Sequence, residues 1–142
     1  YHGSYLMRMA QALPGSRKNW IIQGEEGSID IRPGKKTRIY QAVGDGMVET
    51  MIDAADYGFD EVIPLEMPND AAAHARRIYQ LLNDNPESDP AIRQIILTAG
   101  VHLWMVDAVP DVRAGIERAK ALIESGAVLA IIEPKTTRIA NP

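Results

Sequence analysis

The sequence predicts a globular domain that combines β-strands with α-helices. Short runs of β-branched and aromatic residues fall within the first 66 residues, together with most of the glycines. Residues 67–133 instead carry apolar side chains at helical spacing, behind residue types that favour helix N-termini. These two patterns leave the α/β and α+β classes open. The 142 residues suit one domain or a large piece of one, and a domain of this size buries about 70% of its unfolded surface.

The first half is predicted to hold one helix and three short strands. Residues 4–13 place apolar side chains on one face behind the capping residue Ser4, and Pro14-Gly15 ends this helix. The apolar run 19–23 ends at Gly24 and predicts a buried strand. The elements expected next are a loop over 25–36, a strand over 37–43, a turn at 44–46, a strand over 47–51 and a helical turn at 53–57 that Gly58 ends.

Three amphipathic helices are predicted in the second half. Asn69 is the expected N-cap of the first helix, with Asp70 in its first turn, and residues 83–86 end it. Asp89-Pro90 begins the second helix and Asp111 the third. The stripe expected to be buried in the second helix is Ile92, Ile95, Ile96, Ala99, Leu103 and Val106. The corresponding stripe in the third helix is Val112, Ile116, Ala119, Leu122 and Ile123. The run 128–132 is either a buried strand or a short helix, and the tail 134–142 is polar.

Charge is unevenly distributed along the chain. The net charge is −4, yet residues 16–38 hold six basic and three acidic residues, a local charge of +3. The remaining residues hold nine basic and sixteen acidic residues, a charge of −7. A basic patch on an acidic chain indicates an anionic ligand near that patch, or else a solvated loop that is rich in lysine.

Composition excludes several classes of protein. The chain has no cysteine, so neither a disulfide framework nor thiolate chemistry is available, and a reducing, cytoplasmic location is expected. The longest apolar stretch, 126–132, is far shorter than the ~20 residues that cross a bilayer, so no membrane partner is expected. No signal-peptide pattern opens the chain, and its start at Tyr1 rather than Met predicts that the true N-terminus lies upstream.

Two stretches of the sequence resemble segments of one enzyme family. The first is Trp20-Ile21-Ile22-Gln23-Gly24-Glu25-Glu26-Gly27-Ser28-Ile29-Asp30. It is similar to the segment of anthranilate phosphoribosyltransferases in which a strand ends in His-Gly, followed by an acidic-Gly loop and an Asp-Glu pair. The second runs from Ala99-Gly100-Val101-His102-Leu103-Trp104 through Asp111-Val112-Arg113-Ala114-Gly115-Ile116 to Glu124-Ser125-Gly126-Ala127. It resembles the C-terminal helices of that family. The order of the elements between them also matches, so the resemblance covers nearly the whole chain.

The resemblance implies an α/β fold, the C-terminal portion of the phosphoribosyltransferase α/β domain, in which a short mixed sheet is packed by helices. Residues 1–142 would form one partial domain, with a β-rich part at 1–66, a helical part at 67–133 and a polar tail at 134–142. The family also has an N-terminal helical domain and a Gly-Thr-Gly-Gly-Asp-type loop, and neither has a counterpart in these residues. Backbone N–H groups of such a loop cradle phosphate.

The resemblance also implies a magnesium site, and this sequence departs from it. In the family the Asp-Glu pair helps to hold Mg2+ on pyrophosphate, and the matching positions here are Ile29 and Asp30. Mg2+ prefers one or two carboxylates together with substrate phosphate and water. Asp30 is therefore a candidate ligand without its acidic neighbour, and Glu25 and Glu26 are further candidates just upstream. These substitutions place both magnesium binding and the family's reaction in question.

The remaining candidate site residues are ligand contacts. Gln23 stands where the family has the His of His-Gly, and it keeps hydrogen-bonding capacity but does not titrate. The basic side chains that follow would steer an anionic substrate. The residues expected to contact substrate or phosphate are Gln23, Gly24, Lys35, Lys36 and Arg38. No residue is assigned a catalytic role.

Two functions follow from the resemblance. In the first, the parent protein is a Mg2+-assisted glycosyltransferase of tryptophan biosynthesis. It would move a phosphoribosyl group from phosphoribosyl pyrophosphate to an aromatic amine such as anthranilate, and the 142 residues alone would be inactive. In the alternative, the parent is a non-catalytic paralogue that binds nucleic acid through the basic run 32–38. A third possibility is a scaffold piece whose function lies upstream. The family dimerises through its helical domain, so no strong dimer of this chain is expected.

Other polar and aromatic residues are interpreted as structural. His2, His74 and His102 lack metal-ligand spacing, and His102 is expected to be a satisfied histidine on a core helix. Trp20 and Trp104 are expected in the core.

Overall fold

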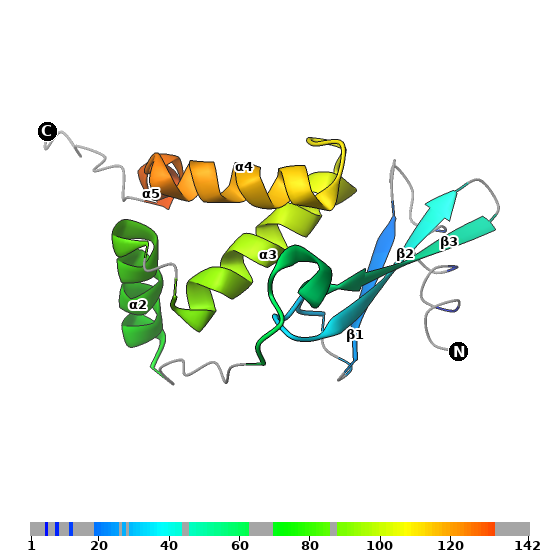
Figure 1. Ribbon diagram of the computed structural model, residues 1–142, viewed down its shortest axis with the longest axis horizontal. Coiled ribbons are helices and arrows are strands. Elements are labelled where there is room, and N and C mark those ends of the chain that lie inside the picture. The colour runs from blue at the N-terminus through cyan, green and yellow to red at the C-terminus, as the bar shows by residue number, and fades with distance from the viewer. Residues whose placement is uncertain are drawn as a thin grey trace, which may run out of the picture.

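The computed structural model describes residues 5, 8, 12, 19–25, 27, 29–43, 46–62, 70–85 and 88–132. A small sheet lies at one end of the molecule and α2 at the other, with α3 running between them (Figure 1). The predicted tail 134–142 and most of the predicted helix 4–13 lie outside the described residues, as do Glu26, the turn residues 44–45 and Asn69. The α/β class is confirmed by this arrangement.

The sheet contains three strands in the order β1-β2-β3. They are β1 (Trp20–Gly24), β2 (Lys36–Val43) and β3 (Gly46–Asp53), each within a few residues of its predicted bounds. Both pairings are antiparallel, so the expected mixed sheet is not found among the described strands. The connections explain this result. A tight hairpin and a loop of about ten residues join antiparallel neighbours easily, whereas parallel neighbours need a crossover of a dozen or more residues.

The two faces of the sheet differ in character. One face lies against the helices and contributes Thr37, Ile39 and Ile52 to the core, with Ile39 fully buried. Side chains alternate between the faces along a strand. The other face therefore carries the intervening residues, among them Gln23, Arg38 and Met51, which lie side by side across the three strands.

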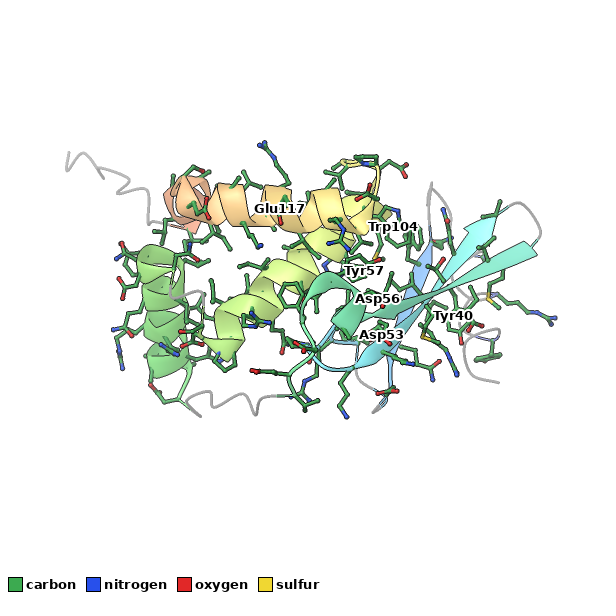
Figure 2. All side chains as sticks on the ribbon, in the orientation of Figure 1. Tyr40, Asp53, Asp56, Tyr57, Trp104 and Glu117 are labelled. Atoms are coloured by element: carbon green, nitrogen blue, oxygen red, sulfur yellow. The ribbon has the colours of Figure 1, made fainter. Side chains whose placement is uncertain are left out.

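A short 3-10 helix, η1 (Ala54–Tyr57), joins the sheet to the helices. Asp53 caps it by accepting a hydrogen bond from the backbone of Ala55, and Gly58 ends it with a φ of 83°, a conformation that favours glycine. Arg113 from α4 donates to the carbonyl of Asp56 at 3.0 Å and lies over the ring of Tyr57. Figure 2 shows Asp53, Asp56 and Tyr57 together at this junction.

Four helices follow η1. They are α2 (Ala71–Asp84), α3 (Pro90–Met105), α4 (Val112–Glu124) and α5 (Ala127–Ile132). The run 128–132 is therefore helical rather than a strand. The N-caps of α3 and α4 are Asp89 and Asp111, as predicted, whereas α2 is capped by Asp70 instead of Asn69. Asp70 accepts a hydrogen bond from the Ala73 amide at 2.7 Å, so its side chain serves the cap and not the first turn.

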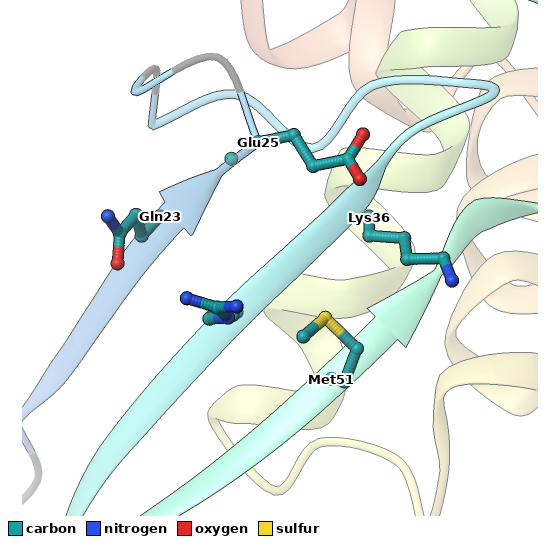
Figure 3. Close-up of a pocket in the computed structure, with 6 residues that line it drawn as sticks. Gln23, Glu25, Lys36 and Met51 are labelled. Carbon is teal, nitrogen blue, oxygen red and sulfur yellow. The ribbon is translucent and has the colours of Figure 1, made fainter.

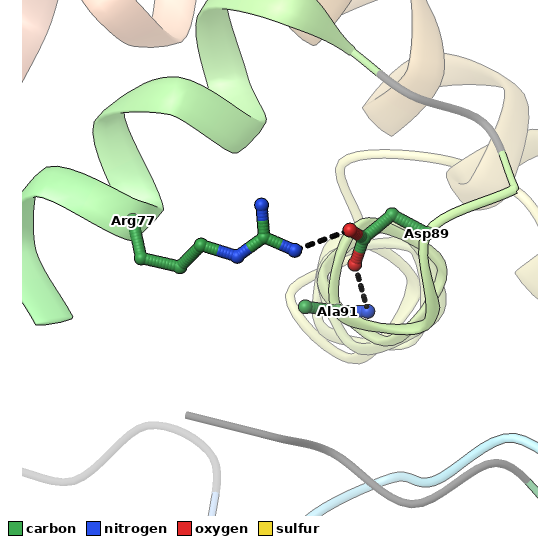
Figure 4. A network of polar contacts seen from close by, with 3 residues as sticks. All are labelled: Arg77, Asp89 and Ala91. Carbon is green, nitrogen blue, oxygen red and sulfur yellow. Dashed lines mark hydrogen bonds and ion pairs between the residues drawn. The ribbon is translucent and has the colours of Figure 1, made fainter. Parts of the chain in front are cut away.

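Asp89 has two roles at the start of α3. One carboxylate oxygen accepts a hydrogen bond from the Ala91 amide at 2.9 Å, and the other is bound by the guanidinium of Arg77 on α2 (Figure 4). The charged end of Arg77 therefore joins α2 to α3. This single carboxylate both starts α3 and ties it to α2.

The core centres on α3, and its buried face differs from the predicted stripe. Ile92 and Ile96 are buried as expected, but Val106 is 67% exposed, and Ile95, Ala99 and Leu103 are only partly buried. The residues buried instead are Leu97, Gly100, Val101 and Met105. The α3 helix packs between the sheet and α4 and is apolar on most sides. The periodicity of its apolar residues therefore does not show which of them are buried.

Two glycines let α3 and α4 approach closely. A Cβ atom on Gly100 would lie 2.7 Å from the Ile116 backbone nitrogen and 2.8 Å from its Cα. A Cβ atom on Gly115 would collide with the carbonyl oxygen of Gly100. The backbones are therefore in contact at this crossing, which leaves no room for any side chain there.

Candidate functional site

A polar pocket of about 220 Å3 lies on the sheet face that carries Gln23, Arg38 and Met51 (the open face). All three strands contribute to it, and the residues that line it are Gln23, Gly24, Glu25, Lys36, Arg38 and Met51. Strand register creates the pocket, because Gln23 pairs with Arg38 and Arg38 pairs with Met51. Figure 3 shows Gln23 on β1, Lys36 at the start of β2 and Met51 on β3 around this space.

The two cations of the pocket each lie beside a carboxylate on β3. The ammonium nitrogen of Lys36 is 3.4 Å from Asp53 Oδ2, and Arg38 Nε is 3.6 Å from Glu49 Oε1. The side chains of Lys36 and Arg38 are about half exposed, 55% and 53%. Exposed pairs of this kind contribute about 0–1 kcal/mol, so an anionic ligand can compete for both cations.

Gln23 is held by a neighbouring tyrosine on the same face. The Tyr40 hydroxyl donates to Gln23 Oε1 at 3.5 Å, a long hydrogen bond from a largely buried side chain. This contact leaves the amide NH2 group of Gln23 as the donor end. Amide, ammonium and guanidinium groups are all hydrogen-bond donors, and the latter two are cationic. The pocket is therefore chemically suited to an anion that carries several oxygens.

The structure gathers four of the five predicted contact residues. Gln23, Gly24, Lys36 and Arg38 line the pocket, together with Glu25, whereas Lys35 does not. The backbone of Lys35 forms a turn with Arg32, which precedes the strand. Met51 also lines the pocket, although it was not predicted as a site residue. Counting outward from the pair Val43–Gly46 that closes the hairpin places Met51 opposite Arg38. The predicted hairpin could therefore have indicated Met51 as a neighbour of Arg38.

The residues present do not fit the magnesium site that the resemblance implies. Ile29, at the position of the family's Asp, is 77% exposed and has no oxygen ligand to offer. Asp30 is exposed and does not line the pocket. Among the described residues, no cluster of three or more His, Asp or Glu side chains is placed to hold a metal ion. The carboxylates of Asp53 and Glu49 already face Lys36 and Arg38.

An apolar groove of about 420 Å3 lies between the helices. Its lining residues are Leu82, Ile95, Ala99, His102, Leu103, Val106, Ala119, Leu122, Ile123 and Val128. His102 is exposed at this groove, on the α3 helix that forms much of the core, and its interpretation as a satisfied histidine stays a prediction. Trp20 and Trp104, both expected in the core, are partly buried and pack against it, and their ring centroids lie 5.7 Å apart. Within the described part of the chain, no helix is long and apolar enough to cross a bilayer.

Comparison with known proteins relates the chain to one enzyme. No protein-family model matches it. It is 33% identical over 116 residues to the anthranilate phosphoribosyltransferase of Myxococcus xanthus, a match that covers 80% of this chain and 33% of that enzyme. It is 27% identical over 136 residues to the enzyme of Rubrobacter xylanophilus, which covers 94% of this chain and 40% of the relative. The chain thus spans well under half the length of these relatives.

A solved structure supports the fold. The anthranilate phosphoribosyltransferase of Saccharomyces cerevisiae, in complex with 4-fluoroanthranilate, superposes with a TM-score of 0.73 at 19% sequence identity. The match covers 90% of this chain and 37% of that one. The sequence and fold comparisons therefore agree on the same enzyme and on a similar share of it. The chain is similar in sequence and in fold to anthranilate phosphoribosyltransferases, over a share of their length that fits a C-terminal fragment.

Proposed function

We propose that this chain belongs to a phosphoribosyltransferase and supplies one wall of its phosphate-binding site. The pocket on the open face of the sheet would contact the phosphate groups of phosphoribosyl pyrophosphate, and an aromatic amine such as anthranilate would be the acceptor. The observation that carries this proposal is the convergence of Gln23, Lys36 and Arg38 in one pocket, next to the segment that resembles the family's His-Gly strand end.

The 142 residues alone are proposed to be inactive. They contain no Gly-Thr-Gly-Gly-Asp-type loop, and a single wall offers too few donors to align two substrates for transfer. The proposed partial domain would be completed by the N-terminal helical domain of the parent protein, through which the parent would also form a homodimer. Incubating the chain with Mg2+, anthranilate and phosphoribosyl pyrophosphate should leave anthranilate fluorescence unchanged. A steady loss of fluorescence would show that these residues suffice.

Binding tests the phosphate contact directly. Isothermal titration of the chain with phosphoribosyl pyrophosphate should show weak binding, because only part of the site is present. The Lys36→Ala and Arg38→Ala substitutions should each weaken it by about tenfold, as expected for the loss of a charge-assisted contact. Arg118→Ala, which removes an exposed cation on α4, is the matched control. Equal affinities for all four proteins would refute a role for the pocket.

The nucleic-acid alternative gains no specific support. None of the relatives reported above is named for nucleic-acid binding. Two cations of the basic run, Lys36 and Arg38, are paired with carboxylates on β3, which lowers the positive potential of this surface.

A further inference from the structure

We propose that the open-face pocket holds its phosphate-bearing ligand through Lys36 and Arg38 without a bridging magnesium ion. This inference rests on the proposed function, since it concerns the same pocket and the same class of ligand. It departs from the magnesium site that the resemblance implies, because Ile29 stands where the family has an aspartate.

Where the family has an adjacent acidic pair, the loop after β1 has Ile29 and Asp30, so these two positions offer a metal one carboxylate. Ile29 occupies the first position of the pair and points its apolar side chain into solvent. Asp30 remains, but it is exposed and lies outside the lining of the pocket. Mg2+ keeps most of its water and gives it up only to well-placed oxygens. Glu25 does line the pocket, but it is exposed, and the described residues place no cluster of three potential ligands around it.

Two carboxylates on β3 are paired with the cations of the pocket. Asp53 and Glu49 on β3 lie beside Lys36 and Arg38 and hold these long side chains over the sheet. A magnesium ion that recruited either carboxylate would have to displace a cation from it and would then sit beside that cation. Repulsion between the ion and the released ammonium or guanidinium opposes this exchange.

The two cations themselves are suitably placed to neutralise a pyrophosphate group. Lys36 and Arg38 lie two residues apart on β2, so they emerge on the same face roughly 7 Å apart along the strand. Their flexible side chains can converge on neighbouring phosphates, with Arg38 offering a planar fork and Lys36 a point charge. The positive charge that a metal would bring is therefore already supplied by the chain.

The test is to titrate the full 142-residue chain with inorganic pyrophosphate in the presence of EDTA, and again with free Mg2+ in excess. Binding in EDTA that Mg2+ does not strengthen is the expected result. Binding that appears only with Mg2+ would overturn this inference while leaving the proposed phosphate contact intact. No binding in either buffer would overturn the proposed function and this inference with it.

A gain-of-function variant sharpens the same test. Ile29→Asp restores an adjacent acidic pair with Asp30, so Mg2+ should strengthen pyrophosphate binding by this variant and not by the unchanged chain. Ile29→Asn, of the same size but uncharged, is the matched control and should not respond. Broadening of the Asp30 amide signal by Mn2+ gives an independent readout in the same proteins. An unchanged chain that responds to either metal as strongly as Ile29→Asp would contradict the inference.

Discussion

The sheet and the helices of this protein differ in how tightly their residues are packed. One face of the sheet packs against the helices, and the other carries Gln23, Lys36 and Arg38 around a polar pocket. The α3 helix instead packs between the sheet and α4, with Leu97 and Val101 fully buried. In the helical half, the backbones of α3 and α4 are in contact. On the open face of the sheet, Lys36 and Arg38 form exposed ion pairs that a ligand can exchange. Substitutions in the helical half should therefore mainly lower the stability of the fold, whereas substitutions on the open face of the sheet should mainly affect the proposed ligand binding.

The largest effect is expected in the core of α3. Leu97→Ala removes a side chain that is 0% exposed and should lower the free energy of unfolding by about 2–5 kcal/mol, through lost burial and the cavity left behind. Met47→Ala on β3, on the same face as Met51 and 42% exposed, should change it by less than about 0.5 kcal/mol. Urea denaturation followed by circular dichroism measures both. Similar losses for the two variants would remove the distinction between the regions.

A smaller loss is expected at the crossing of α3 and α4. Gly115→Ala gains about 1 kcal/mol of intrinsic helix propensity, yet its methyl group would strike the Gly100 carbonyl. Overpacking of this kind costs about 1–3 kcal/mol, so the net effect should be a lower melting temperature. Arg118→Ala, on the exposed side of the same helix, is the control. A more stable Gly115→Ala protein would mean that the helices are not in backbone contact.

The junction of α2 and α3 should show an effect of about 1–2 kcal/mol. Asp89→Ala loses both the cap on Ala91 and the ion pair with Arg77. Asp89→Asn keeps an N-cap and loses only the charge, so it should destabilise the protein less. Chemical denaturation of the two variants separates the contributions. If both lose the same free energy, the ion pair rather than the cap holds this junction.

The smallest effect is a pH dependence at the link between sheet and helices. Burial, reinforced by the charge of Asp56, raises the pKa of Tyr57 above its usual value of 10.0. The folded state therefore prefers the neutral phenol, so this contribution to stability is complete below pH 10.0 and is lost as the pH rises through the higher folded pKa. Tyr57→Phe keeps the ring under Arg113 but does not titrate.

The free energy of unfolding of both proteins should be measured below and above pH 10.0 to check this expectation. The unchanged chain should lose more stability than Tyr57→Phe as the pH rises. Parallel curves for the two proteins would show that Tyr57 titrates alike in the folded and unfolded states.

Local signals in the sequence predicted most of the elements. Asp89-Pro90 and Asp111 mark helix starts through chemistry that needs only neighbouring residues, and the hairpin and the turn at Gly58 are equally local. The prediction failed where a helix packs on more than one side. The apolar residues of α3 surround the helix, so whether Leu97 or Val106 is buried depends on where α4 and the sheet lie.

The site was predicted in its residue types but not in its geometry. Four contact residues were selected because they resemble a family segment or lie in a basic run, and they do line one pocket. Lys35 was indistinguishable from Lys36 in the sequence, because the residue at which β2 begins decides which lysine joins the open face. Met51 enters the site only through the register of the hairpin, which the closing pair Val43–Gly46 sets.

The most direct test of the division between the two regions is a map of ligand-induced shifts. Amide and side-chain NMR signals of the chain should be recorded during titration with inorganic pyrophosphate in EDTA. The changes should concentrate on Gln23, Gly24, Lys36, Arg38 and Met51 and leave α3 and α4 unaffected. Changes that centre on the helices, or that spread evenly over exposed lysines and arginines, would contradict the assignment of ligand binding to the open face of the sheet.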